Sequence, residues 1–164
     1  MLGRNYYFSG QYDLAIKQLE KTITIDPNYI YAKIYLALAL AGNKSFPRAI
    51  EILSKLPAKR FGTNEYPPLY LIYVYSLMDD KAKAKKELNE LINSEAYKEG
   101  QMLDPFLFSA VYLNLGDKEK ALSLLELGYD YRIIQMMHVK VNPYFDALKN
   151  DERFKDLLKR LHFN

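Results

Sequence analysis

Catalysis and metal binding need reactive side chains in suitable groupings, and this chain of 164 residues offers few of them. It contains no cysteine, which excludes disulfides, zinc thiolate sites and cysteine nucleophiles. Its two histidines, His138 and His162, are far apart in the sequence and have no carboxylates at ligand spacing beside them. The seven glycines are scattered at predicted turns and form no phosphate-binding loop. The sequence therefore predicts no catalytic residue, no metal site and no cofactor, and we expect a protein that is not an enzyme.

Charge and hydropathy exclude further classes of partner. A formal net charge of +3 is too small to indicate a nucleic-acid-binding surface. A basic cluster at residues 81–86 is interpreted as the solvated face of a helix rather than as a site for an acidic partner. The longest nearly apolar run, residues 67–78, is well short of the roughly 18 residues that indicate a membrane span. No basic-then-apolar leader opens the chain, so we expect a cytoplasmic protein with neither nucleic acid nor membrane as partner.

Binding residues must be positioned by regular elements, and residues 104–126 show most clearly what these elements are. An Asp-Pro pair opens a run that is apolar nearly all round, a Gly-Asp pair ends it, and an amphipathic run follows. This order predicts a helix, a tight turn and a second helix. We expect Asp104 to cap the first helix and Asp117 to cap the second.

The same layout occurs four times along the chain. Four alanines stand at intervals of 34, 35 and 37 residues, at Ala15, Ala49, Ala84 and Ala121. Four residues after each alanine stands a leucine, at Leu19, Leu53, Leu88 and Leu125. Nine residues before each alanine stands a large side chain, at Tyr6, Leu40, Tyr75 and Tyr112. Four units aligned in this way predict a repeat protein, in which each repeat packs on its neighbours.

This pattern resembles the tetratricopeptide repeat, whose units contain Leu-Gly, an aromatic residue, a helix break, Ala-x3-Phe and a closing Pro. The first unit matches best, with Leu2-Gly3, Tyr6, Ala15, Leu19 and Asp26-Pro27. The tryptophan of the family pattern is missing from every unit, and proline closes only the first. The resemblance implies an all-α fold, a right-handed superhelical solenoid of helix-turn-helix repeats with a C-terminal capping helix.

We predict that the repeat array spans residues 1–131 and that a C-terminal extension spans residues 132–164. The expected repeats occupy about residues 1–27, 28–61, 65–98 and 102–131. Within the extension, residues 139–141 are predicted to be extended, and Asn150 is expected to cap a last helix. An apolar stripe on that helix is predicted to cover the end of the array, as solenoids require.

The leading helix of each repeat is predicted to line the inner face of the solenoid, because it is nearly free of polar residues while the trailing helix is amphipathic. Its side chains that point away from the trailing helix form a predicted partner-binding groove. These residues are Tyr31, Ile34, Tyr35, Leu38, Tyr66, Leu69, Tyr70, Tyr73, Leu77, Phe106, Ala110, Leu113 and Asn114. Arg4 and Tyr7 continue the same stripe in the first repeat.

Tyrosine suits recognition because it combines a large apolar ring with a hydroxyl and loses little entropy on binding. We therefore predict a non-enzymatic scaffold that binds an extended or helical segment of another protein in this groove. Relatives that bind chaperone tails clamp a carboxylate with Lys, Arg and Asn in the equivalent groove. Aromatic and aliphatic residues dominate here, so no such clamp is predicted. The opposing interpretation is that the tyrosines only pack between repeats or against the chain's own tail.

Two other interpretations remain open from the sequence. Residues 142–158 are similar to the C-terminal ends of tetratricopeptide regions in bacterial multidomain regulators, where the repeats follow a winged-helix, kinase or cyclase domain. The chain would then be the sensory or docking arm of a larger regulator, although this sequence contains no such effector domain. In the second of these interpretations, the chain is a self-assembly module. Its first repeat begins within the leading helix, and the edge of this repeat meets a second copy of the chain.

Overall fold

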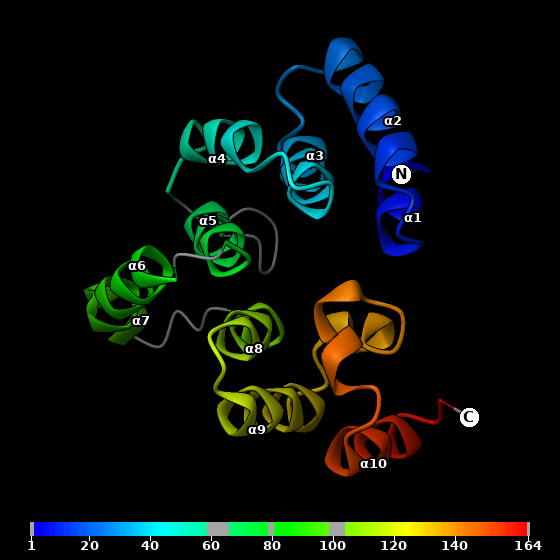
Figure 1. Cartoon of the computed structure of the whole chain (residues 1–164), viewed down its shortest axis with the longest axis vertical. Helices are drawn as coiled ribbons and strands as arrows, with labels where there is room; N and C mark the ends of the chain where they lie inside the picture. The colour runs from blue at the N-terminus through cyan, green and yellow to red at the C-terminus, as the bar shows by residue number, and fades with distance from the viewer. Residues whose placement is uncertain (1, 59–65, 79–80, 99–103, 164) are drawn as a thin grey trace. The chain divides into compact units, whose positions relative to one another are not determined.

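A computed structural model describes residues 2–58, 66–78, 81–98 and 104–163. Figure 1 shows helices joined by turns, and the described residues contain no β-strand, in agreement with the predicted all-α class. The chain divides into two compact units, residues 1–91 and residues 92–164. The predicted repeat boundaries at residues 61, 65 and 102 lie outside the described residues.

The first unit consists of consecutive helices that pack in the order of the chain. They are α1 (Leu2–Phe8), α2 (Tyr12–Ile25), α3 (Ile30–Gly42), α4 (Phe46–Ser54), α5 (Pro67–Ser76) and α6 (Ala82–Asn93), the last of which ends in the second unit. Each helix from α1 to α4 contacts the next, and α3 also contacts α1 and α5. The leading helices α1, α3 and α5 are therefore neighbours, as a helical repeat array requires.

Small residues explain the repeat period, because they stand where paired helices meet. The four alanines that define the period are fully buried, at Ala15, Ala49, Ala84 and Ala121. In the first pair, a Cβ added to Gly3 would lie 2.6 Å from Cγ of Leu19, so glycine is needed for α1 to approach α2 this closely. Gly42 similarly faces the ring of Tyr12, to which an added Cβ would approach within 2.7 Å.

The second unit contains the last repeat and the C-terminal extension. Its elements are α7 (Glu95–Lys98), α8 (Pro105–Asn114), α9 (Lys118–Asp130), the short 3-10 helices η1 (Ile134–His138) and η2 (Pro143–Leu148), and α10 (Glu152–Arg160). Helix α8 packs on α9 and on η2, while α9 also contacts η1 and α10. The extension therefore folds back onto the last helix pair.

Both predicted caps of this helix pair are confirmed. The side chain of Asp104 accepts a hydrogen bond from the backbone N–H of Phe106 at 2.9 Å. Asp117 accepts one from the N–H of Lys120, also at 2.9 Å. Each aspartate satisfies an N–H group that has no partner inside its helix.

Two local predictions for the extension are wrong. Residues 139–141 form a turn rather than an extended segment, because the N–H groups of Val141 and Asn142 both donate to the carbonyl of His138. The Asn142 side chain then caps η2 by accepting from the N–H of Tyr144 at 3.0 Å. Asp151, not Asn150, caps α10, and it accepts from the N–H groups of two residues in the first turn.

The predicted capping helix is present, and α10 buries one apolar side. Phe154 and Leu157 are each 1% exposed. The ring of Phe154 lies 6.2 Å from the ring of Phe145 on η2. Helix α10 thus covers apolar surface of η2 and α9 within the second unit.

Candidate partner-binding face

The structure divides the predicted groove residues into two groups by burial. Six are buried, namely Ile34, Leu38, Leu69, Tyr73, Phe106 and Ala110. Seven are half-buried, namely Tyr31, Tyr35, Tyr66, Tyr70, Leu77, Leu113 and Asn114. Only the second group offers surface to a partner, and four of its seven members are tyrosines of the first unit.

On α3, the two tyrosines lie one helical turn apart and therefore on one side of the helix. The ring of Tyr35 contacts α1, at 5.9 Å from the ring of Tyr7 and 6.0 Å from that of Phe8. The guanidinium of Arg4 lies 6.0 Å from the ring centres of both Tyr35 and Phe8. The cation–π contact of Arg4 and the ring contact of Tyr7 therefore connect the predicted stripe on α1 with Tyr35 on α3.

On α5, one side carries tyrosines at the spacing of a helical turn. Tyr66 stands at the N-cap position, Tyr70 is half-buried in the first turns, and Tyr73 is buried. The next tyrosine, Tyr75, is turned toward α6, where Nζ of Lys83 lies 4.2 Å from its ring centre. The hydrogen bond to Tyr75 raises the pKa of Lys83. Through this contact the ring of Tyr75 contributes to the pairing of α5 with α6 and not to the predicted groove.

On α8, the predicted groove residue Phe106 is covered by the chain's own C-terminal extension. Its ring lies 4.9 Å from that of Phe145 in an edge-to-face arrangement, and 6.3 Å from that of Tyr144. Phe106 is 4% exposed as a result. At this position the chain's own tail occupies the face that the sequence assigned to a partner.

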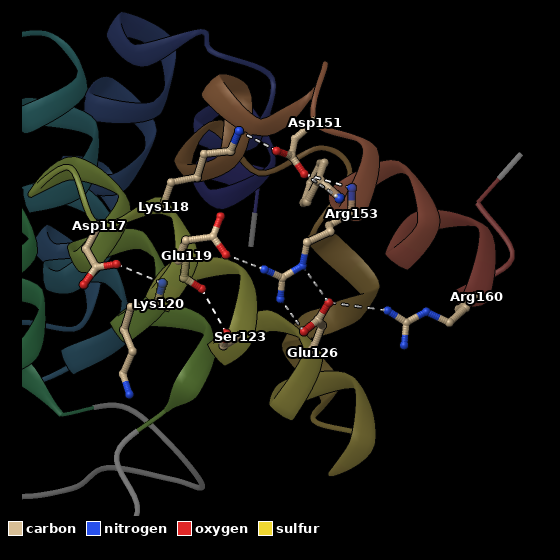
Figure 2. A network of polar contacts seen from close by, with 10 residues as sticks. Asp117, Lys118, Glu119, Lys120, Ser123, Glu126, Asp151, Arg153 and Arg160 are labelled. Carbon is tan, nitrogen blue, oxygen red and sulfur yellow. Dashed lines mark hydrogen bonds and ion pairs between the residues drawn. The ribbon is translucent and has the colours of Figure 1, made fainter.

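A network of ion pairs holds the capping helix on α9 (Figure 2). Arg153 forms a bidentate contact with Glu126, at 2.7 and 3.3 Å, and reaches Glu119 at 2.8 Å. Lys118 pairs with Asp151, the residue that caps α10. Hydrogen bonding to Glu126 raises the pKa of Arg153, and that from Lys118 lowers the pKa of Asp151. These groups are charged at neutral pH and have a structural role.

The sequence analysis does not predict this network, although one part of it, the spacing of the two glutamates, can be recognised in the sequence. Glu119 and Glu126 are seven residues apart and so lie on one side of a helix. Their partner Arg153 lies 34 and 27 residues further on, and no periodic pattern links positions so far apart. An apolar pocket in the same extension was also missed.

The described residues contain no cluster of three or more His, Asp or Glu residues suited to a metal ion. No helix within the described ranges is long and apolar enough to cross a membrane. The half-buried tyrosines of the first unit are the candidate functional surface.

Comparison with known proteins agrees with this architecture. Residues 9–67 match the sequence profile of the tetratricopeptide repeat family, over a region that includes α2, α3 and α4. No curated protein and no solved structure matches the chain. The matched region, the four-fold alanine period and the all-helical fold together support a tetratricopeptide repeat architecture.

Proposed function

We propose that this protein is a docking scaffold whose first unit binds a segment of another protein across a tyrosine face. The tyrosine face consists of Tyr31 and Tyr35 on α3 together with Tyr66 and Tyr70 at the start of α5. Tetratricopeptide repeats generally mediate protein–protein interaction, and they are typically not enzymes. The bound segment is expected to be extended or helical.

The observation that carries the proposal is the combination of half-buried tyrosines with a buried layer beneath them. Ile34, Leu38 and Leu69 are at most 2% exposed, so the helices under the face are firmly packed. The tyrosine rings above them keep part of their surface in solvent. Rings that are held in place lose little entropy on binding and supply large apolar area, which is typical of interface hot spots.

The α1 end of the face adds one cation. Nε of Arg4 is buried and has no hydrogen-bond partner among the described residues, and its guanidinium lies against two aromatic rings. A single arginine does not make a carboxylate clamp, which needs several convergent donors. The proposed contact is therefore mainly apolar and aromatic.

Site-specific photo-crosslinking in the source cells tests the proposal. A benzoylphenylalanine at position 31 or 70 is expected to form a covalent adduct with one and the same protein. The matched control carries the crosslinker at Ile25, which is 86% exposed and lies outside the tyrosine face. Adducts that are equally abundant at position 25, or that form only between copies of this chain, would contradict the proposal.

A further inference from the structure

Tyrosines recur at equivalent positions of the second and third repeats. Tyr31 and Tyr66 are 35 residues apart, as are Tyr35 and Tyr70, and the same interval separates the period-defining alanines of these two repeats. Equivalent residues of successive repeats lie on the same side of a repeat array. The tyrosine face therefore consists of two half-buried pairs in register, one on α3 and one at the start of α5.

The spacing of these pairs follows from helix packing. Helix α3 contacts both α1 and α5, and packed helices lie about 8 to 10 Å apart. A segment in the polyproline II conformation rises about 3.1 Å per residue with about three residues per turn, so its side chains on one side recur about every 9 Å. The corresponding repeat is about 5.4 Å along an α-helix and about 7 Å along a β-strand. Of the three conformations, polyproline II matches the helix spacing, so a segment of this kind that crosses the leading helices places one side chain over each of them.

The polar groups around the tyrosine face are donors rather than carboxylate acceptors. Helices α1, α3 and α5 contain no Asp or Glu. At the α1 end, the guanidinium of Arg4 lies 6.0 Å from the ring centre of Tyr35, and its Nε has no hydrogen-bond partner among the described residues. At the α5 end, the Tyr66 side chain caps no helix N–H, and its hydroxyl has no hydrogen-bond partner within the described ranges. A guanidinium only donates and a phenol readily donates, so a partner rich in free carbonyl groups complements this face.

Given the proposed docking function, on which this inference rests, we propose that the tyrosine face binds a proline-rich segment in the polyproline II conformation. Such a segment has no internal hydrogen bonds, so its carbonyl groups are free to accept from Arg4 and Tyr66. Proline brings no N–H group, whereas an ordinary extended segment would bring N–H groups for which these helices hold no carboxylate. Proline-rich segments dock in aromatic-lined grooves and lose little entropy, because their conformation is already formed. About seven residues reach from α1 to α5.

Titration of labelled decaproline into the full-length chain, followed by fluorescence anisotropy, tests this assignment. The wild type is expected to bind decaproline and to show no binding of a flexible Gly-Ser peptide of equal length. Tyr31→Ala/Tyr70→Ala is expected to lower the affinity about tenfold or more, because two rings of the contact are lost. Tyr66→Phe keeps the ring but removes the donor, and a loss of about threefold is expected. Failure of the wild type to bind decaproline, or unchanged affinity in both variants, would overturn the proposal.

The matched control removes two aromatic rings from the second unit. An apolar pocket of about 710 Å³ lies there, and its lining includes Tyr129, Ile133 and Phe163. Tyr129→Ala/Phe163→Ala is expected to bind decaproline like the wild type, and circular dichroism checks that each variant keeps its helicity. Loss of binding in this control, with binding retained in Tyr31→Ala/Tyr70→Ala, would overturn the proposal and place the proline-rich segment in the pocket.

The match between repeat spacing and polyproline II turns is tested with two peptides of identical composition. Both contain proline and alanine only, with proline at every third position in one and at every second position in the other. The first is expected to bind severalfold more tightly, because its prolines share one side of the segment at the spacing of the leading helices. Equal affinities, or tighter binding of the second peptide, would overturn the proposed register.

The photo-crosslinked partner separates this inference from the docking function itself. Proteolysis and mass spectrometry of the adduct formed at position 31 or 70 identify the segment that lies on the tyrosine face. A proline-rich segment is the expected result. A segment without proline, or one that is helical in the partner, would overturn the inference and leave the docking function in place. Absence of any adduct specific to the face would contradict the docking function, and this inference with it.

Discussion

At the scale of single residues, the helix contacts depend on side chains that are small or absent. Gly3 is the sharpest case, because an added Cβ would lie 2.6 Å from Cγ and 2.9 Å from Cδ2 of the fully buried Leu19. The obstacle is the middle of a packed side chain rather than a flexible end. The leucine has no empty space to move into, since interiors are close-packed.

We predict that Gly3→Ala lowers the free energy of unfolding by about 1 to 3 kcal/mol through overpacking. Urea denaturation followed by circular dichroism measures the change. Asn5→Ala is the control, because Asn5 is exposed on the same helix. In the double variant Gly3→Ala/Leu19→Ala, the loss of unfolding free energy is expected to be smaller than the sum of the losses in the two single variants. Full additivity would show that the two residues do not interact.

A second prediction concerns Asp151, whose pKa is lowered by hydrogen bonding to Lys118 and to the N–H of Phe154. A carboxyl with a lowered pKa in the folded state stabilises the fold above its ordinary pKa of 3.8. This stabilisation is lost as the pH falls through the lower, folded value. Asp151→Asn keeps the capping oxygen but removes the charge, so the variant should be less stable than the wild type at pH 7.

Urea midpoints measured between pH 7 and about 2.5 test this dependence. The difference between wild type and Asp151→Asn is expected to stay constant down to about pH 4 and to shrink below it. Asp130→Asn serves as a control, because Asp130 is exposed and forms no ion pair among the described residues. A difference that persists unchanged into acid would exclude the charge of Asp151 as its cause.

At the scale of elements, α10 is held by burial first and by ion pairs second. Phe154 is 1% exposed against η2, whereas Arg153 and its partners keep access to solvent. Exposed ion pairs contribute little each, because water and salt screen them. The fit of the capping helix therefore depends mainly on its apolar stripe.

We predict that Phe154→Ala destabilises the second unit by about 3 to 5 kcal/mol. In hydrogen exchange, the amides of α8, α9 and α10 should exchange faster, while those of α2 and α3 keep their rates. Arg153→Met is the comparison, since it removes the ion pairs but leaves Phe154 in place, and its effect should be smaller. Equal effects of the two variants would contradict the conclusion that burial holds α10 more strongly than its ion pairs do.

The same elements show what the sequence can and cannot predict. Asp104 and Asp117 are capping residues that act within three positions of themselves, so their roles were predicted correctly from local pattern. The sequence analysis predicts an extended segment at residues 139–141, and this prediction is wrong. The N–H groups of Val141 and Asn142 instead converge on one carbonyl, and this turn lets η2 fold back onto α8.

The predicted groove was harder to resolve, for a physical reason. Helices α3, α5 and α8 are apolar on nearly every side, so periodicity shows that they are buried but not which side stays accessible. Phe106 illustrates the difficulty, because its cover comes from Phe145, 39 positions further along the chain. Partial exposure of Tyr31 or Tyr70 became evident only once the helices were packed.

At the scale of the whole molecule, the proposed docking surface is mainly aromatic. The tyrosine face of the first unit consists of half-buried rings, with Arg4 as a cation at its α1 end. Salt screens charge–charge attraction, with a screening length of about 10 Å at 0.1 M, and affects apolar contacts far less. Binding to the tyrosine face should therefore depend little on the ionic strength of the medium.

We predict that raising sodium chloride from about 0.05 to 0.5 M changes the affinity of the crosslinked partner for the tyrosine face by less than about threefold. Calorimetry with the purified partner measures this salt dependence. A complex that loses about tenfold or more in affinity over the same range would show that charge, not aromatic contact, dominates it.

The most direct test of the central claim is calorimetric titration of the crosslinked partner against three forms of the chain. The wild type is compared with Tyr31→Ala/Tyr70→Ala and with Tyr131→Ala, whose tyrosine is 63% exposed but lies outside the tyrosine face. The account predicts that the double variant weakens binding by about 30-fold, as expected for hot-spot residues, while Tyr131→Ala binds like the wild type. Equal affinity of all three forms would contradict the assignment of the tyrosine face as the docking surface.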